Sequence, residues 1–349
     1  MTEVCGRLIW EPITLKLRNP FRISHGVSQV RQAYWLRLED DSGWGEGTIP
    51  PYYGIEDDEM SAYWKEAAQR QAPFPDDPAQ IGTWVGEIGP APARCALDLA
   101  LHDRIGRRRD VPLYELLGLP RPLPRSTSFT IGMDSPTETA RQTAKLRGYT
   151  IFKVKVGGKD DEGVIAAIRQ ARPDVRLRVD ANAAWTVDEA VRCIHKLSRY
   201  GIELVEQPVA RDDIEGMGWV QQQVDVPIVA DESVQTLEDV ERLAADGVQG
   251  VNIKLMKVGG LAPGLRMLKR ARELGMRIML GCMVETSLGT TAMAHLAGMA
   301  DWLDLDAPLL LSNDPFDGLR YDVQGKLYLS ARPGIGVIQR SKLRNDEID

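Results

Sequence analysis

The chain has 349 residues, enough for one large domain and a smaller one, and 43% of its residues are hydrophobic, enough for a sizeable core. Its net charge of −7 argues against nucleic-acid binding, and no window approaches the roughly 18 apolar residues of a membrane span. The four cysteines form no CxxC pair, and Glu3, Arg7 and Glu11 interrupt the start of the chain where a signal peptide needs an apolar run. We therefore expect reduced thiols, a cytoplasmic location, and neither a nucleic-acid nor a membrane partner.

Strand patterns precede helical patterns in the N-terminal part of the chain. Residues 4–17 and 32–47 have the composition of strands, and the second run includes an Asp-Ser-Gly turn. Residues 57–70 and 91–108 follow with helical patterns. Strands followed by helices are typical of an α+β arrangement, so residues 1–124 are predicted to form a separate α+β domain.

Short apolar strands alternate with helices in the rest of the chain. The expected strands are 126–132, 150–157, 175–182, 202–208, 227–233, 250–260, 277–285 and 302–310. The expected helices between them are 136–147, 161–171, 186–200, 212–223, 236–245 and 261–274. Eight such units predict an α/β fold of the (β/α)₈ TIM-barrel type over residues 125–320. A doubly wound open sheet is the alternative, although no G-x-G-x-x-G follows the first strand. Residues 321–349 are expected to return to the N-terminal domain.

Charged residues recur at the carboxyl ends of the predicted strands, at intervals of 23 to 26 residues. They are Lys155, Asp180, Glu206, Asp231 and Lys254. The carboxyl ends of barrel strands form a ring, where the active sites of such barrels lie. The spacing therefore predicts that these five side chains converge on one pocket.

Three of these residues, Asp180, Glu206 and Asp231, are carboxylates on adjacent strands. Like charges at close range repel each other unless a cation neutralises them. Ligation by oxygen alone, without Cys or His, suits a hard ion, and Mg²⁺ is the ion we expect. The alternative is that each acid caps the following helix or pairs with Arg176 or Arg178.

Two lysines flank the carboxylates, Lys155 one strand before them and Lys254 one strand after. This order predicts a pair of bases that face each other across the metal, one for each face of a carbon atom. Lys153 lies on the same strand face as Lys155, where its charge would lower the pKa of Lys155 and stabilise an oxyanion. The alternative is a pair of solvated lysines on an edge strand.

Five motifs together resemble those of the enolase superfamily in its muconate-lactonising-enzyme subgroup. They are KVK (153–155), DAN (180–182), EQP (206–208), DES (231–233) and NIKLMK (252–257). The resemblance implies that residues 1–124 are a capping domain and that the three carboxylates bind Mg²⁺. It also implies that Lys155 and Lys254 are the acid/base pair for an enediolate formed from a carboxylate substrate.

The predicted eighth strand ends in Asp304 and Asp306, which are similar to the Asp-x-Asp motif that holds the α-ammonium in dipeptide epimerases. The alternative is a pair of helix-capping aspartates. The motif implies a Mg²⁺-dependent dipeptide epimerase, an isomerase that inverts the α-carbon of the C-terminal residue of an L,L-dipeptide by a two-lysine 1,1-proton transfer. The other functions considered are a lyase such as o-succinylbenzoate synthase or muconate cycloisomerase, an N-acylamino acid racemase, and a non-catalytic binding barrel.

The resemblance also implies several substrate contacts. Thr130, Cys282 and Val284 end barrel strands, and two capping loops, residues 19–29 and 47–56, would close over the pocket. Family members that act on Ala-Glu carry an arginine where this chain has Gly26, with Arg22 and His25 nearby, which argues against that substrate. Arg22 is the substrate contact expected there. Tyr52 and Tyr53 are either an apolar subsite or surface residues, and Glu285 is left without a role. A homo-oligomer is left open.

Overall fold

The N-terminal part of the computed structural model is an antiparallel sheet with helices packed on it. The structure describes residues 2–24 and 26–340. The sheet has the order β1-β2-β3-β4. Its strands are β1 (Glu3–Cys5), β2 (Leu8–Ile23), β3 (Gly26–Leu38) and β4 (Trp44–Gly47). The helices are α1 (Asp57–Ala68), α2 (Ile81–Val85), α3 (Ala91–Arg109) and α4 (Leu113–Leu116).

Close packing between β4 and α3 holds this layer together. The strand has the sequence Trp-Gly-Glu-Gly and is buried along its whole length. A Cβ atom on Gly45 would lie 1.8 Å from the carbonyl oxygen of Ala96, so only glycine permits this contact. A separate apolar core that includes Trp10, Leu36 and Trp64 fills the space between sheet and helices.

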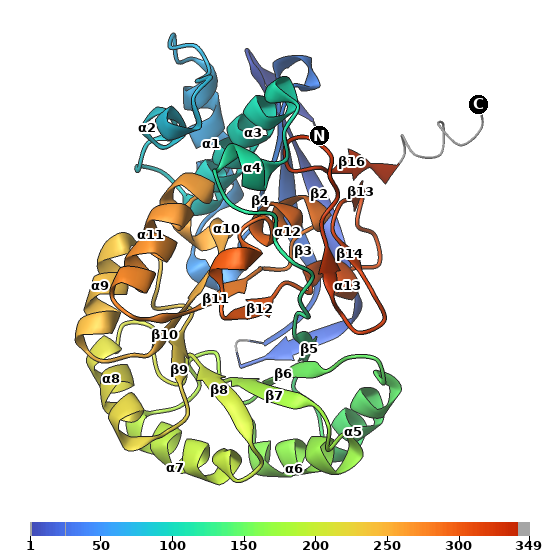
Figure 1. Ribbon diagram of the computed structural model, residues 1–349, viewed down its shortest axis with the longest axis vertical. Coiled ribbons are helices and arrows are strands. Elements are labelled where there is room, and N and C mark those ends of the chain that lie inside the picture. Colours follow the sequence, from blue (N-terminus) through green and yellow to red (C-terminus); the bar gives the residue numbers. More distant parts are fainter. Residues whose placement is uncertain (1, 25, 341–349) are drawn as a thin grey trace.

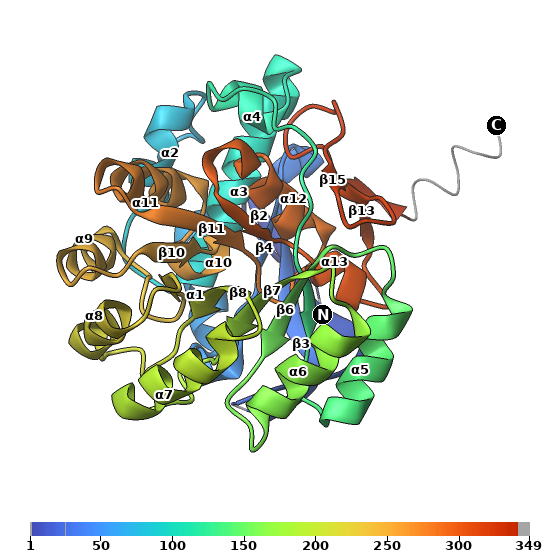
Figure 2. The same ribbon diagram turned by 60° about the horizontal axis from the view of Figure 1, so that its bottom comes forward.

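The second part is a barrel of eight strands, all parallel, in the order β5 to β12. A backbone bond from Ser128 N to Leu303 O (3.1 Å) links the two edges, so the barrel is nearly closed (Figures 1 and 2). The strands are β5 (Phe129–Ile131), β6 (Ile151–Lys155), β7 (Arg176–Asp180), β8 (Ile202–Glu206), β9 (Ile228–Ala230), β10 (Gly250–Ile253), β11 (Arg277–Gly281) and β12 (Trp302–Asp304). The predicted (β/α)₈ barrel is therefore confirmed, and the open doubly wound sheet is wrong.

Helices alternate with the barrel strands and form its outer ring. They are α5 (Pro136–Lys145), α6 (Asp161–Ala171), α7 (Val187–Ser198), α8 (Ile214–Gln223), α9 (Leu237–Ala245), α10 (Leu255–Val258), α11 (Leu261–Glu273), α12 (Ser287–Ala294) and α13 (Ala307–Leu310). None of the helices in the described residues is long and apolar enough to cross a membrane.

The chain after the barrel runs along the N-terminal domain. It forms the short strands β13 (Phe316–Asp317), β14 (Arg320–Tyr321), β15 (Leu327–Tyr328) and β16 (Ile338–Gln339). Gly334 exchanges backbone bonds with Val111 and Leu113, and Ile335 N donates to Asp103 on α3 (2.8 Å). The proposed domain limits at 124 and 320 stay predictions, and the last part of the C-terminal segment, residues 341–349, lies outside the described residues.

The long β2–β3 hairpin extends from the N-terminal sheet to the open end of the barrel (Figure 1). At its tip, Ser24 Oγ donates to the carbonyl of Asn182 (2.9 Å), and Met133 N donates to the carbonyl of Arg22 (3.0 Å). The segment 19–29, expected as a loop, therefore consists largely of paired strand. It covers the ends of β5 and β7, where the sequence predicts the functional residues.

Acidic side chains of the N-terminal domain cap two barrel helices. Asp98 on α3 accepts bonds from Leu261 N (2.6 Å) and Ala262 N (3.2 Å) at the start of α11. Glu46 on β4 accepts bonds from Thr286 N (2.9 Å), Thr286 Oγ1 (2.6 Å) and Gly289 N (3.0 Å) at the start of α12. Backbone N–H groups at a helix start favour anions, so these contacts fix the two domains against each other.

The fully buried Glu46 makes the stability of this interface depend on pH. Burial raises the pKa of Glu46 from 4.5 to about 7, although the bonds from Thr286 and Gly289 oppose the shift. A raised carboxyl pKa means that the folded state keeps a proton that the unfolded state releases. The contribution is therefore present below about pH 4.5 and is lost as the pH rises through 7.

We expect the ionisation of Glu46 to lower the free energy of unfolding of the wild type by about 2 to 3 kcal/mol between pH 5 and 8. Because Gln cannot ionise, Glu46→Gln should lack this part of the pH dependence. Urea unfolding of both proteins at the two pH values measures this difference. Glu39→Gln, a change at an exposed acid of the same domain, is the control and should keep the wild-type pH dependence. Equal pH dependence in Glu46→Gln and wild type would contradict the assignment.

Candidate active site

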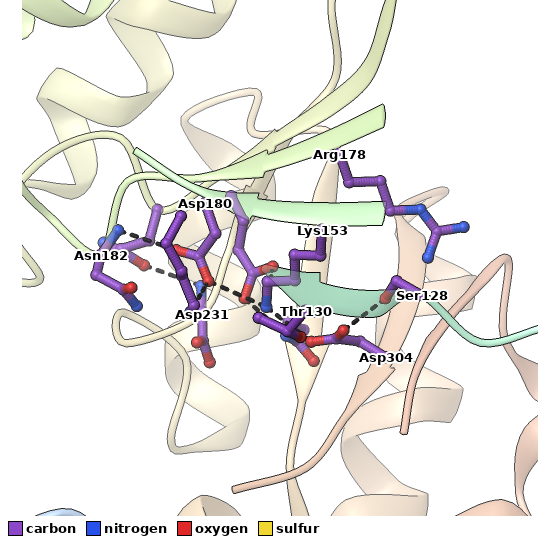
Figure 3. Close-up of polar contacts among 12 residues, drawn as sticks. Ser128, Thr130, Lys153, Arg178, Asp180, Asn182, Asp231 and Asp304 are labelled. Atoms are coloured by element: carbon purple, nitrogen blue, oxygen red, sulfur yellow. Dashed lines mark hydrogen bonds and ion pairs between the residues drawn. The ribbon is translucent and has the colours of Figure 1, made fainter. Parts of the chain in front are cut away.

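Three buried carboxylates lie together at the carboxyl ends of β7, β8 and β9. Asp180 and Glu206 end their strands, and Asp231 directly follows β9. One carboxylate oxygen from each lies within 4.8 Å of the others. Figure 3 shows Asp180 and Asp231 close together at this point. Burial, followed by the charge of Asp180, raises the pKa of Glu206 to about 8. The structure therefore brings together the predicted trio, and its all-oxygen donor set fits a hard divalent cation such as Mg²⁺.

Four lysines neutralise this cluster. Lys155 Nζ lies 2.6 Å from Asp180 Oδ2, and Lys254 Nζ lies 2.7 Å from Asp231 Oδ2. The two predicted bases thus contact opposite members of the trio. A third lysine, Lys257, lies 2.5 Å from the other oxygen of Asp231, Oδ1.

Lys153 occupies the centre of the site. Its Nζ lies 3.0 Å from Asp180, 2.8 Å from Glu206 and 2.7 Å from Asp304 (Figure 3). Burial alone would lower the pKa of Lys153, but the attraction of Asp180, Asp304 and Glu206 outweighs it and holds this pKa well above its usual value. The alternative of solvated lysines on an edge strand is wrong, since β6 is buried between β5 and β7.

Neighbouring side chains orient the carboxylates. Asn252 Nδ2 donates to Glu206 Oε1 (2.9 Å), and the backbone N of Asn182 donates to Asp180 Oδ1 (2.9 Å). Gln207 Oε1 accepts from the backbone N of Asp231 (2.9 Å). These contacts were not foreseen, although Asn182, Gln207, Asn252 and Lys257 all belong to the motifs already quoted. Their polar side chains at strand ends were the available signal.

The two aspartates at the end of β12 have different environments. Asp304 accepts from Ser128 Oγ (2.5 Å) and pairs with Lys153, whereas Asp306 accepts from the backbone N of Thr130 (2.6 Å). Asp306 forms no ion pair with any described residue. Burial, then the charge of Asp304, raises its pKa to about 7. Sequence analysis assigned the same role to both aspartates. In the structure, Asp306 is the one whose carboxylate remains open to a cation.

A cavity lies against these charged groups and is covered by the N-terminal domain. Its barrel side is lined by Thr130, Lys153, Lys155, Asn182, Lys254, Cys282, Met283, Val284, Asp304, Asp306, Ala307 and Leu310. Its capping side is lined by Phe21, Ile23, Ser28, Arg31, Pro50 and Tyr52. The predicted contacts Thr130, Cys282 and Val284 therefore lie on the cavity wall, together with Tyr52.

Other residues singled out from the sequence lie elsewhere. Arg22 lines a neighbouring groove beside α5, and Tyr53 packs against Tyr52 with 5.1 Å between ring centroids. Glu285 accepts from Met283 N (3.2 Å) and Thr290 Oγ1 (3.4 Å), near Glu46. His25 lies outside the described residues. Arg31, which sequence reasoning missed, lines the cavity beside the charged groups.

Comparison with known proteins shows the family to which the chain belongs. The model of the enolase C-terminal domain-like family matches residues 137–341. The chain is 36% identical to an L-Ala-D/L-Glu epimerase of Bacteroides thetaiotaomicron over 339 residues, covering 95% of this chain and 88% of that protein. It is 39% identical to a hydrophobic dipeptide epimerase of Enterococcus faecalis over 264 residues, covering 72% and 74% of the two chains.

A solved structure of a dipeptide epimerase has the same fold as this chain. The dipeptide epimerase of Enterococcus faecalis V583, in complex with Mg and the dipeptide L-Leu-L-Tyr, superposes with a TM-score of 0.89 at 32% identity. The match covers 95% of this chain and 99% of that one. Both chains thus have an eight-stranded parallel barrel with an N-terminal antiparallel domain, which is the fold of this class of proteins. The chain belongs to the enolase C-terminal domain-like family.

A cation bound by the carboxylate trio should stabilise the fold. We expect millimolar Mg²⁺ to raise the melting temperature of the wild type and EDTA to reverse the rise, because binding to the native state alone stabilises it. Glu206→Gln should largely lose the response, since one oxygen ligand is replaced by a neutral amide. Glu285→Gln alters another buried carboxyl and should keep it. A similar Mg²⁺ response in all three proteins would exclude the trio as the metal site.

Proposed function

We propose that the chain is a Mg²⁺-dependent dipeptide epimerase that inverts the α-carbon of the C-terminal residue of an L,L-dipeptide. One observation carries this proposal: Lys155 and Lys254 reach the cavity from opposite sides of the carboxylate trio, and Asp306, which has no ion pair among the described residues, lines the same cavity. The epimerase names of the curated relatives support the proposal.

The dipeptide would be oriented by its two charged ends. Its α-ammonium would pair with Asp306, which has no cationic partner in residues 2–24 and 26–340, and its α-carboxylate would lie toward the lysines and the metal site. Mg²⁺ bound by Asp180, Glu206 and Asp231 would offset the negative charge that develops on this carboxylate as the α-proton leaves. Lys153 contributes a further positive charge at the same place.

Inversion needs one proton acceptor and one donor on opposite faces of the α-carbon. When the C–H bond of one configuration breaks, its proton passes to the amine of one lysine, and the ammonium of the other lysine returns a proton to the opposite face. Both lysines line the cavity, Lys155 from β6 and Lys254 from the end of β10. The reverse reaction uses the same two groups with their roles exchanged.

The substrates of the principal alternative enzymes lack an ammonium group that Asp306 could bind. A muconate-cycloisomerase-type or o-succinylbenzoate-synthase-type lyase and an N-acylamino acid racemase act on substrates without a free α-ammonium. Two buried carboxylates, Asp304 and Asp306, would repel such anionic substrates. Incubation of a dipeptide library with the protein and Mg²⁺ in D₂O, read by mass increase, tests the proposal directly. Failure of every dipeptide to exchange would contradict it.

The lysine variants test the two-base assignment. Lys155→Ala and Lys254→Ala should each lose epimerisation by about 10²–10⁴-fold, the usual contribution of a positioned acid or base. Each should still exchange the α-proton of the one diastereomer that faces its remaining lysine. Proton NMR of both diastereomers in D₂O measures this. If either variant exchanges both diastereomers at equal rates, the assignment is wrong.

The role of Asp306 can be tested with the charge of the substrate. Asp306→Asn should lower kcat/KM for free dipeptides by about 10²-fold, because a buried charge-assisted contact with the ammonium is lost. The variant should discriminate far less than the wild type between a free dipeptide and its N-acetyl form. Faster turnover of N-acetyl dipeptides by the wild type would instead favour an acylamino acid racemase.

A further inference from the structure

The two walls of the cavity differ in their charge. The barrel wall carries three lysines and two aspartates, which in the proposed reaction would contact the amine, the carboxylate or the α-carbon that every dipeptide has. The capping wall is then left to contact the side chains of the dipeptide, which vary. Among its described lining residues, Arg31 alone carries a charge, and its neighbours include Phe21, Pro50 and Tyr52.

The guanidinium of Arg31 lacks the partners that a partly buried arginine normally has. Arg31 lies on β3 and is partly buried. Its Nη2 donates to Ser28 Oγ (3.2 Å), and its buried Nε has no partner. No ion pair to Arg31 occurs in residues 2–24 and 26–340. A cation removed from water without a counter-ion is unfavourable, and burial lowers the pKa of Arg31 accordingly.

Arg37, on the same strand, shows that this situation is not general. Its Nε also lacks a bond, but its guanidinium pairs with Glu11 (3.5 Å) and Asp41 (4.0 Å) and lies over the ring of Trp35 (4.5 Å). The charge of Arg37 is thus already balanced within the N-terminal domain. Arg31 is the arginine of this pair that is left to bind an anion, and it lines the substrate cavity.

We infer that Arg31 selects dipeptides that carry a side-chain carboxylate, so that the substrates are acidic dipeptides. This inference rests on the proposed epimerase function and names its substrate class. A guanidinium binds a carboxylate through parallel hydrogen bonds, and the unpartnered Nε supplies one donor of such a pair. Gly26 lacks the arginine expected for Ala-Glu, and Arg31 would supply the same chemical group from a different position of the hairpin.

The test compares isosteric substrates that differ only in charge. Epimerisation of L-Ala-L-Glu and L-Ala-L-Gln is measured with Mg²⁺ in D₂O, and L-Glu-L-Ala and L-Gln-L-Ala form a second pair. We expect the wild type to prefer the acidic member by about 10- to 100-fold in kcat/KM, as befits a charge-assisted contact. The pair that shows the preference identifies which residue of the dipeptide Arg31 reads.

Variants assign the preference to the residue. Arg31→Gln should abolish it, mainly through the acidic substrate, and Arg31→Lys should keep much of it because the charge remains. Arg37→Gln makes the same change outside the cavity and should leave the ratio unchanged. Since the readout is a ratio within one protein, a general loss of stability does not mimic the result.

The two hypotheses fail in different ways. If dipeptides exchange but the wild type prefers neutral ones, or if Arg31→Gln lowers both members of each pair equally, the inference about Arg31 is wrong and the epimerase proposal stands. If no dipeptide exchanges, the proposed function is wrong, and the substrate class inferred from it falls with it.

Discussion

The constraint on which the site depends is the burial of three carboxylates at one point. Asp180, Glu206 and Asp231 are almost completely excluded from water, and their mutual repulsion must be offset by cations. The protein meets this need with lysines from β6 and from the end of β10, the strands on either side of the trio. The same charge balance that lets the barrel fold therefore places two amines on opposite sides of the position where a substrate carboxylate would bind.

The barrel presents these groups, and the N-terminal domain closes the site over them. Its attachment uses acids in a different way: Asp98 and Glu46 accept hydrogen bonds from backbone N–H groups at the N-termini of α11 and α12. The arrangement requires very close approach. A Cβ on Gly260, just before α11, would lie 2.4 Å from the carboxyl carbon of Asp98. Because these contacts fix the sheet, they also fix the position of the β2–β3 hairpin over the strand ends.

The sequence predicted those features that repeat with the fold. The barrel follows from the alternation of strands and helices, and the ring of charged residues follows from their recurrence at strand ends. Neither required knowledge of contacts between distant residues. The segment 19–29 was expected as a loop because the family resemblance implies a capping loop there, whereas pairing between β2 and β3 extends the strands to Ile23 and from Gly26.

Contacts between the two domains were beyond the reach of pattern reasoning. Glu46 meets Thr286 across 240 residues, and nothing in the local sequence of β4 marks it as a helix cap. The different roles of Asp304 and Asp306 depend on Lys153, which reaches across the barrel interior to only one of them. Arg31 has no motif around it. Its candidate role depends on two structural observations: Arg31 lines the cavity, and its Nε has no hydrogen-bond partner among the described residues.

These facts suggest how one barrel chemistry serves different substrates. The groups proposed to act on the α-carbon belong to a buried charge network, in which Lys153 pairs with Asp180, Glu206 and Asp304, and Asp231 pairs with Lys254 and Lys257. Arg31 stands outside this network, and within the described part of the chain its side chain donates to Ser28 on its own strand. Substitution there costs the trio nothing. Substitutions in the capping wall can therefore change the substrate preference while the charged barrel wall stays the same. This separation is expected where related proteins keep one reaction and differ in their substrates.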